Sequence, residues 1–148
     1  MSWAHAQLLD GEQALWDRMR RQDRRHSLAV AHRVDEALGA DAPREVLAAA
    51  LLHDVGKLDS NLGPFYRVAA TAAAKVAGHD MADPWASTSG VTRRIGLYLL
   101  HPQIGADHLR MAGSHALTVA WAEEHHNEPD GGSVPEPYAT VLREADDD

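Results

Sequence analysis

The sequence predicts a single all-α domain, and three observations support this prediction. Apolar residues recur with helical spacing through most of the chain. Alanine is frequent, whereas the alternation of β-branched residues that is typical of strands is scarce. The length of 148 residues and the hydrophobic fraction of 45% suit one domain with one core. We find no internal repeat, low-complexity tract or linker, so residues 1–148 are interpreted as one domain.

Composition excludes several classes of function. The formal net charge is −8, from 14 basic and 22 acidic residues, which argues against general nucleic-acid binding. A small anionic substrate is still compatible, because a bound metal ion reverses the local sign of the field. The chain has no cysteine, so any metal must be bound through nitrogen and oxygen. The N-terminal segment is acidic and has no long apolar run, which predicts a cytoplasmic protein without a signal peptide or membrane span.

The first half of the chain is expected to form three helices. A short helix is predicted over 12–19, and a longer one over 21–38, which Gly39 would end. The expected inward face of the longer helix consists of Ala29, Val30, Val34, Ala37 and Leu38. A third helix is predicted over 43–54, with Pro43 in its first turn and Gly56 after its end.

The second half continues the helical pattern with one interruption. A helix over 64–77 is predicted, and residues 79–90 are interpreted as a loop because they collect Pro, Ser, Thr and Gly without a period. Further helices are expected over 91–100, 102–111, 114–126 and 136–146. The break at His101 follows from Pro102, which disfavours a helical residue before it, and Ser114 is a candidate N-cap.

Side chains that bind metals fall at the ends of these apolar stripes or at helix breaks. They are His26, His53, Asp54, His101, His125 and Asp146. A lone inward histidine would be interpreted as an ordinary core residue with a hydrogen-bond partner. Six such residues on five segments are harder to bury, because each unpaired imidazole or carboxylate is costly in an apolar interior. A metal centre would remove that cost.

The ordered set resembles the HD-domain superfamily of metal-dependent phosphohydrolases. Residues 44–58, "REVLAAALLHDVGKL", carry its signature, with Lys57 after His-Asp-x-Gly. Leu142, Ala145 and Asp146 resemble the Leu-x-x-Ala-Asp ending of that superfamily. The resemblance covers about residues 21–146, and it implies an HD-domain helical bundle with a metal centre between its helices.

A narrower resemblance to the HD-GYP branch, which cleaves cyclic dinucleotides, is partial. "HPQIGADHL" at 101–109 and "HHNEPDGGSVP" at 125–135 are similar to the motifs of that branch. Asn127 stands where the branch has Glu, Ser133 and Val134 replace Gly-Tyr, and Gln22 replaces the Glu of three-metal members. The six residues instead match the pattern of two-metal HD proteins.

The resemblance implies a division of roles among these residues. His26, His53, Asp54 and Asp146 would bind one ion, and His101 and His125 would complete a second ion site. Asp54 is the natural bridge, since its two oxygens can reach two ions. These ligand types suit Mn, Fe, Ni, Co or Zn and do not choose among them.

Catalysis is assigned to Asp54 and to Lys57. Lys57 would contact a substrate phosphate or orient the bound water, with a solvated lysine in a turn as the alternative. His126 is a candidate for a further metal ligand, a substrate contact or a hydrogen-bonding support of a ligand. Arg93 and Arg94 are candidates for phosphate contacts, with exposed surface charge as the alternative. His5, His32, His79, His108 and His115 are interpreted as surface or core residues.

The leading hypothesis is a phosphohydrolase or phosphodiesterase that acts on a nucleotide or another small phosphate ester through a metal-activated water. One alternative is an HD-type di-iron oxygenase, because some HD proteins use the same six ligands around two irons. A second alternative is a non-catalytic regulatory HD module, although such modules typically lack part of the ligand set.

Overall fold

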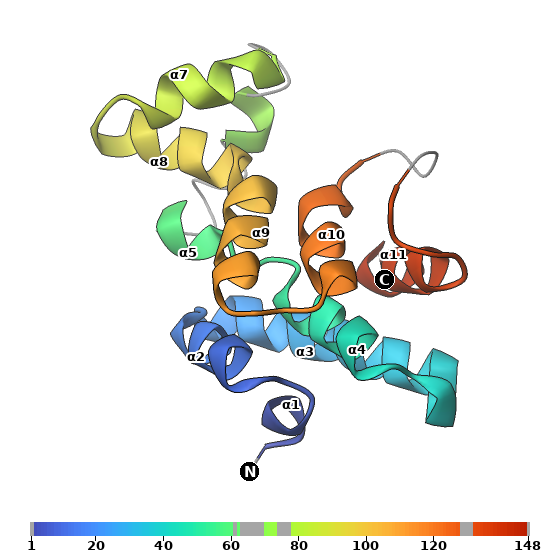
Figure 1. Ribbon diagram of the computed structural model, residues 1–148. Helices are drawn as coiled ribbons and strands as arrows, with labels where there is room; N and C mark the ends of the chain where they lie inside the picture. The colour runs from blue at the N-terminus through green and yellow to red at the C-terminus, as the bar shows by residue number, and fades with distance from the viewer. Residues whose placement is uncertain (1, 61, 63–69, 74–77, 128–131, 148) are drawn as a thin grey trace.

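The computed structural model describes residues 2–60, 62, 70–73, 78–127 and 132–147, and within them it is all-helical (Figure 1). The first half contains α1 (Trp3–Ala6), α2 (Asp10–Arg18), α3 (Arg21–Leu38), the 3₁₀ turn η1 (Gly39–Asp41), α4 (Arg44–Leu52) and α5 (Lys57–Ser60). The second half contains η2 (His79–Met81), α7 (Ala82–Ala86), α8 (Gly90–Leu99), α9 (His101–Met111), α10 (Ala116–Glu124) and α11 (Tyr138–Asp147). The predicted all-α fold is therefore confirmed.

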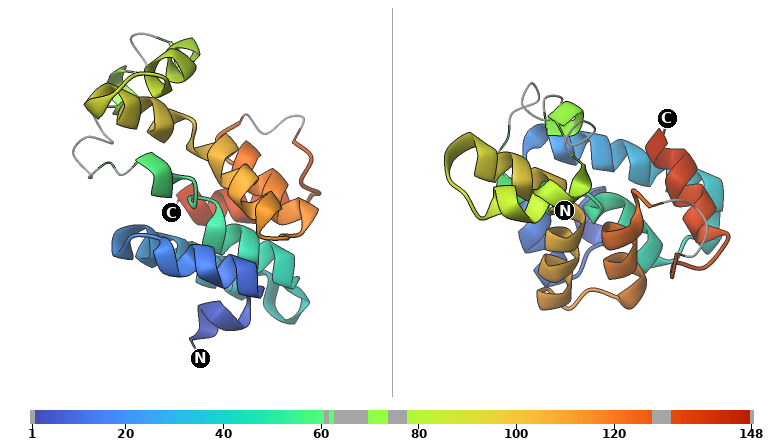
Figure 2. Two further views of the ribbon diagram at one scale, coloured as in Figure 1. Left: turned by 60° about the vertical axis from the view of Figure 1, so that its left-hand side comes forward. Right: turned by 90° about the horizontal axis from the view of Figure 1, so that it is seen from above.

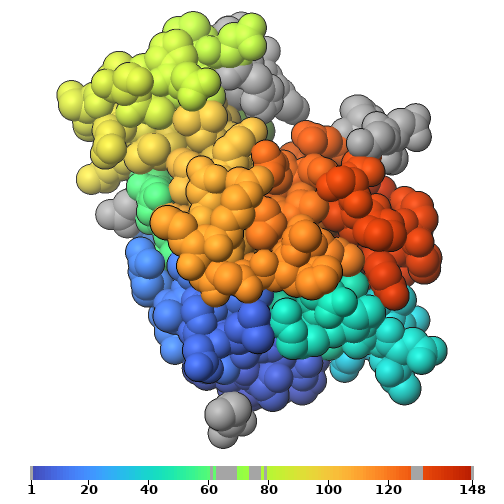
Figure 3. Space-filling view, in the orientation of Figure 1, coloured from blue at the N-terminus to red at the C-terminus, as the bar shows by residue number. Residues whose placement is uncertain are grey.

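The helices form a bundle with a projecting hairpin. Helix α4 packs against α3 on one side and α10 on the other, α9 lies against α10, and α11 packs on α3. The hairpin of α7 and α8 extends away from the α3–α4 layer (Figure 2). In the space-filling view, α9 and α10 form one continuous face of the molecule (Figure 3). None of the helices in the described part of the chain combines the length and the apolar character needed to cross a bilayer.

Helix α4 is the centre of the core. All residues from Val46 to Leu52 are buried, because helices cover α4 on more than one side. A helix that is apolar all round has no solvent face, so it must be enclosed. Because α4 is enclosed, its C-terminal end lies in the interior of the protein, and His53 and Asp54, which follow it, are buried there.

Helix α3 has the predicted bounds but a shifted inward face. Val30 and Val34 are buried as expected, whereas Ala29 and Ala37 are exposed, so the prediction for these two alanines was wrong. The buried face instead includes Asp23, Ser27 and Ala31. Residues three or four positions apart lie on the same face of a helix, and such steps back from Val34 reach Ala31, Ser27 and Asp23. Alanine is small enough to lie on the buried or the exposed face of a helix.

The segment 79–90 is not a loop, which corrects the interpretation from its composition. It contains η2 and the short helix α7. A Cβ on Gly96 of α8 would overlap the backbone nitrogen of Ala86 and lie 2.7 Å from the carbonyl oxygen of Ala82, so the glycine lets α7 pack closely. The hydroxyls of Ser87 and Thr88 donate to carbonyls of α7. The polar residues that suggested a loop therefore end a helix.

Two other expectations need comment. Ser114 does not cap α10, which begins at Ala116, because the Nδ1 atom of His115 accepts the hydrogen bond from the amide of Leu117 at 3.2 Å. The helix predicted over 64–77 lies mostly outside the described residues, although 70–73 are helical.

The first turn of α9 rests on the chain at Gly56. A Cβ on Gly56 would overlap the carbonyl oxygen of His101 and lie 2.6 Å from the backbone nitrogen of Gly105. A Cβ on Gly105 would in turn lie 3.1 Å from the backbone nitrogen of Gly56. This backbone-to-backbone contact places His101 beside the His53–Asp54 turn.

We predict that Gly56→Ala separates α9 from this turn and lowers the free energy of unfolding by about 2 kcal/mol, since a well-packed backbone contact has no room for a methyl group. Urea unfolding followed by circular dichroism would measure the change. Gly132→Ala is the matched control, because among the described residues its Cβ would meet a side chain, the Glu124 carboxylate at 3.0 Å, and no backbone atom. Equal stability of the two variants would contradict the importance of the contact.

Candidate metal centre

The structure brings the six predicted residues together from different parts of the bundle. His53 is the C-cap of α4, and Asp54 follows it in the turn. His101 begins α9, and His125 is the C-cap of α10. His26 comes from α3 and Asp146 from the last turn of α11.

Three buried imidazoles share one hydrogen-bonding arrangement. The Nδ1 atoms of His53, His101 and His125 lie 2.9, 2.7 and 3.0 Å from the carbonyl oxygens of the residues three positions earlier, Ala50, Tyr98 and Ala122. A carbonyl oxygen can only accept, so each Nδ1 carries a proton, and in the neutral imidazole Nε2 then offers a lone pair. The carbonyls at the ends of α4, α8 and α10 thereby fix both the tautomer and the direction of these rings.

The Asp54 carboxylate lies between the Nε2 atoms. Its Oδ2 atom is 3.6 Å from Nε2 of His53 and accepts a hydrogen bond from the ammonium of Lys57. Its Oδ1 atom is 3.5 Å from Nε2 of His101 and 3.9 Å from Nε2 of His125. The two oxygens therefore face different histidines.

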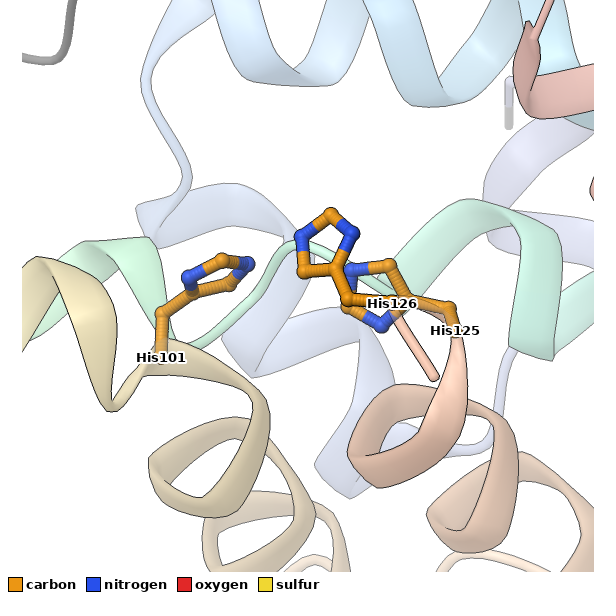
Figure 4. Close-up of side chains that lie close together, drawn as sticks. All are labelled: His101, His125 and His126. Atoms are coloured by element: carbon orange, nitrogen blue, oxygen red, sulfur yellow. The ribbon is translucent and has the colours of Figure 1, made fainter. Parts of the chain in front are cut away.

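Two clusters of potential metal ligands flank Asp54. The mixed cluster consists of His26, His53 and Asp146, and the imidazole cluster consists of His101, His125 and His126. Within each cluster the ligand atoms lie within 4.8 Å of one another. Figure 4 shows the imidazole cluster, in which rings from the start of α9 and the end of α10 converge. Either cluster could hold a metal ion.

Unpaired buried atoms support this interpretation. Among the described residues, Oδ1 of Asp54 and Nε2 of His101 and of His125 are buried without a hydrogen-bond partner. An unpaired polar group in the interior costs about 1–3 kcal/mol, and more when it is charged. Three acceptor atoms that face one another cannot satisfy each other, whereas one cation could satisfy all three. The donor set, imidazole nitrogen and carboxylate oxygen, fits a divalent transition metal.

The electrostatics favour an ionised Asp54 and neutral His125 and His126, which are the protonation states that metal binding requires. Burial alone would raise the pKa of Asp54, but His53, His101 and Lys57 together hold that pKa well below its usual range. Burial and the neighbouring imidazoles lower the pKa of His125 well below its usual value. Loss of hydration around the ring, together with His101, lowers the pKa of His126 to about 4, although this residue lies at the surface.

The side of the centre at His26 is open to solvent. The His26 side chain is 45% exposed and that of Asp146 is 22% exposed, whereas that of His53 is 2% exposed. Nε2 of His26 lies 3.0 Å from Oδ1 of Asp146, and this hydrogen bond raises the pKa of His26. Burial alone would raise the pKa of Asp146, but the hydrogen bond with His26 and the nearby His53 lower it. Arg33 donates to the carbonyl of Ala145 at 2.8 Å and so ties α11 to α3 at this point.

Lys57 and Tyr98 lie beside the centre. The Lys57 ammonium is 5.9 Å from the centre of the Tyr98 ring, which also stacks on His101 with ring centres 5.5 Å apart. Tyr98 could not be identified from the residue pattern, apart from its position one helical turn before His101. Arg93 and Arg94 are exposed on the first half of α8, and their contact with a substrate stays a prediction.

His5, His32, His108 and His115 make other contacts, outside the two clusters. The Nε2 atom of His5 lies 2.8 Å from Asp17, that of His108 lies 3.1 Å from Asp59, and His32 stacks on Trp3. His115 caps α10.

Comparison of the chain with family models, curated proteins and solved structures gives no match. The resemblance to the HD superfamily therefore stays a prediction from the residues. The geometry itself goes beyond that prediction at His126, which the motif left undecided among several roles and which the fold places in the imidazole cluster.

We predict that the metal-free protein loses stability as the pH falls from 6.5 towards 4. The pKa values of His125 and His126 are lowered from 6.5, so in this range the unfolded chain binds more protons than the folded protein. The raised pKa of His26 has the opposite effect on stability. We expect the two lowered pKa values, those of His125 and His126, to outweigh it. Urea unfolding of chelator-treated protein at about pH 7 and about pH 5 would measure the difference.

The variant His126→Gln isolates one contribution to this pH dependence. Glutamine does not titrate in this range. The free energy of unfolding of the variant should therefore fall less steeply with decreasing pH than that of the unchanged protein. A free energy of unfolding that is constant or rises towards about pH 5 would contradict the lowered pKa values.

Proposed function

We propose that this protein is a metal-dependent phosphohydrolase or phosphodiesterase that acts on a nucleotide or another small phosphate ester through a metal-activated water. The observation that carries the proposal is the buried Asp54 carboxylate, whose two oxygens face two separate clusters of potential ligands. Such an arrangement fits two ions that share one carboxylate. The resemblance of "LLHDVGKL" to the HD signature supports the same class of reaction.

The mixed cluster and the imidazole cluster would each hold one ion, with Asp54 between them. When bound, divalent ions of this kind lower the pKa of water and neutralise charge on phosphoryl oxygens. Phosphoryl transfer depends mainly on positioning and on charge stabilisation, and a pair of such ions supplies both.

The chain's own residues contribute orientation and charge. The backbone carbonyls of Ala50, Tyr98 and Ala122 hold the three buried imidazoles with their Nε2 atoms inward. His53 and His101, together with Lys57, which donates to Asp54, keep this carboxylate ionised in the interior. The ammonium of Lys57 is a flexible cation next to the centre, so it is suited to contact a phosphate oxygen of the substrate. The exposed side at His26 provides an approach from solvent.

We predict that Asp54→Asn lowers phosphoester hydrolysis by about a thousandfold while the helical content stays unchanged. Asparagine has the same shape, but it lacks the charge that both clusters share. The assay would measure p-nitrophenol release from p-nitrophenyl phosphate and from bis(p-nitrophenyl) phosphate, followed by a panel of nucleotides. Protein treated with chelator, and then resupplied separately with Mn²⁺, Fe²⁺, Ni²⁺, Co²⁺ or Zn²⁺, would establish metal dependence.

The matched control is Asp59→Asn, which removes a carboxylate five residues further along the chain that pairs with His108. This variant should keep the hydrolytic rate of the unchanged protein. Full activity in Asp54→Asn, or hydrolysis that persists without metal, would contradict the proposal. Turnover that requires iron and consumes oxygen, without phosphate release, would instead indicate the oxygenase.

A further inference from the structure

The two clusters differ in the chemistry of their donors. The mixed cluster contains a carboxylate of its own, from Asp146, together with two imidazoles. The imidazole cluster contains three imidazoles, and among the described residues the carboxylate oxygen that reaches it is Oδ1 of Asp54. The Oδ2 atom of Asp54 faces the mixed cluster and carries the hydrogen bond from Lys57. Among the described residues, anionic oxygen is therefore concentrated on the side of the mixed cluster.

Donor type determines which ions bind well. Carboxylate and water oxygens suit Mg²⁺ and Mn²⁺, whereas imidazole nitrogens suit Zn²⁺, Ni²⁺ and Co²⁺. Three histidines that leave one position open are also a known arrangement for zinc. A hard ion in the imidazole cluster would have one anionic oxygen and would gain little from three neutral nitrogens.

The imidazole cluster is also prepared for binding. Hydrogen bonds to Tyr98 and Ala122 hold the rings of His101 and His125, and both Nε2 atoms are buried without a hydrogen-bond partner. The ring of His126 packs on that of His125 with centres 4.0 Å apart and lies 5.2 Å from that of His101. His126 thus supplies a third nitrogen at the open edge of a pair that the fold already orients.

We propose that the two clusters bind different classes of divalent ion: the mixed cluster accepts Mn²⁺, and the imidazole cluster selects ions that prefer nitrogen, such as Zn²⁺, with His126 as its third ligand. The inference rests on the metal centre of the proposed function and not on the phosphoester chemistry. It makes the centre a site for two unlike ions.

The test uses the full chain without a histidine tag, stripped with chelator and titrated with Mn²⁺ alone and with Zn²⁺ alone. Native mass spectrometry would count the bound ions, and calorimetry would give their affinities. The expected result is one tightly bound Mn²⁺ per chain and two tightly bound Zn²⁺. Two Mn²⁺ ions of similar affinity, or one Zn²⁺ only, would overturn the proposal.

Three variants assign each ion to its cluster. His126→Ala should weaken one of the two Zn²⁺ ions by about a hundredfold and leave Mn²⁺ binding unchanged. His26→Ala should weaken Mn²⁺ and leave the Zn²⁺ ion of the imidazole cluster. His5→Ala, at a histidine that pairs with Asp17, is the control and should change neither ion. Two Zn²⁺ ions at unchanged affinity in His126→Ala would overturn the role of His126.

Hydrolysis assays on the same samples separate this inference from the proposed function. Selective binding without any phosphoester hydrolysis would contradict the proposed reaction and leave the selectivity intact. Hydrolysis by a chain that binds two Mn²⁺ ions equally well would contradict the selectivity and leave the reaction intact.

Discussion

The burial of the Asp54 carboxylate is the constraint on which the rest of the centre depends. An ionised carboxylate in the interior is unstable unless nearby groups compensate its charge and its lost hydration. Lys57 supplies one hydrogen bond, whereas the buried imidazoles direct Nε2 lone pairs at the two oxygens from within 4 Å and leave Oδ1 without a donor. The apolar helix α4 forces this burial, because every residue of its last two turns is enclosed by neighbouring helices. A cation between the carboxylate and these imidazoles would compensate the charge of Asp54 and the unpaired Nε2 atoms together.

At three helix ends, one histidine side chain both satisfies a free backbone carbonyl and orients its ring towards the centre. The last carbonyls of a helix have no partner within the helix, and a buried end needs donors. His53, His101 and His125 donate Nδ1–H to carbonyls at the ends of α4, α8 and α10. The hydrogen bond that satisfies the carbonyl also points the other ring nitrogen, Nε2, towards Asp54. Local backbone structure thus determines the arrangement of the centre.

Much of this arrangement could be predicted from the sequence, because helical periodicity identifies which residues end an apolar stripe. The bounds of α3 and the convergence of the other five predicted residues around Asp54 followed from that pattern. Contacts between distant segments could not be predicted in this way. Helix α7 depends on its close packing at Gly96, and the contact of Gly56 with α9 depends on two backbones meeting. The place of His126 depends on the turn that follows α10.

The convergence of helix ends has an electrostatic consequence. Helices α4, α10 and α11 all direct their carboxyl ends towards the centre, and each such end carries a partial negative charge of about half an elementary charge. The end of α8 lies beside the start of α9, so these two largely cancel. The backbone alone therefore creates a negative potential that attracts cations and repels anions. For the anionic substrate of the proposed function, bound cations would have to reverse that potential first, so the helix directions favour filling the centre with cations before substrate.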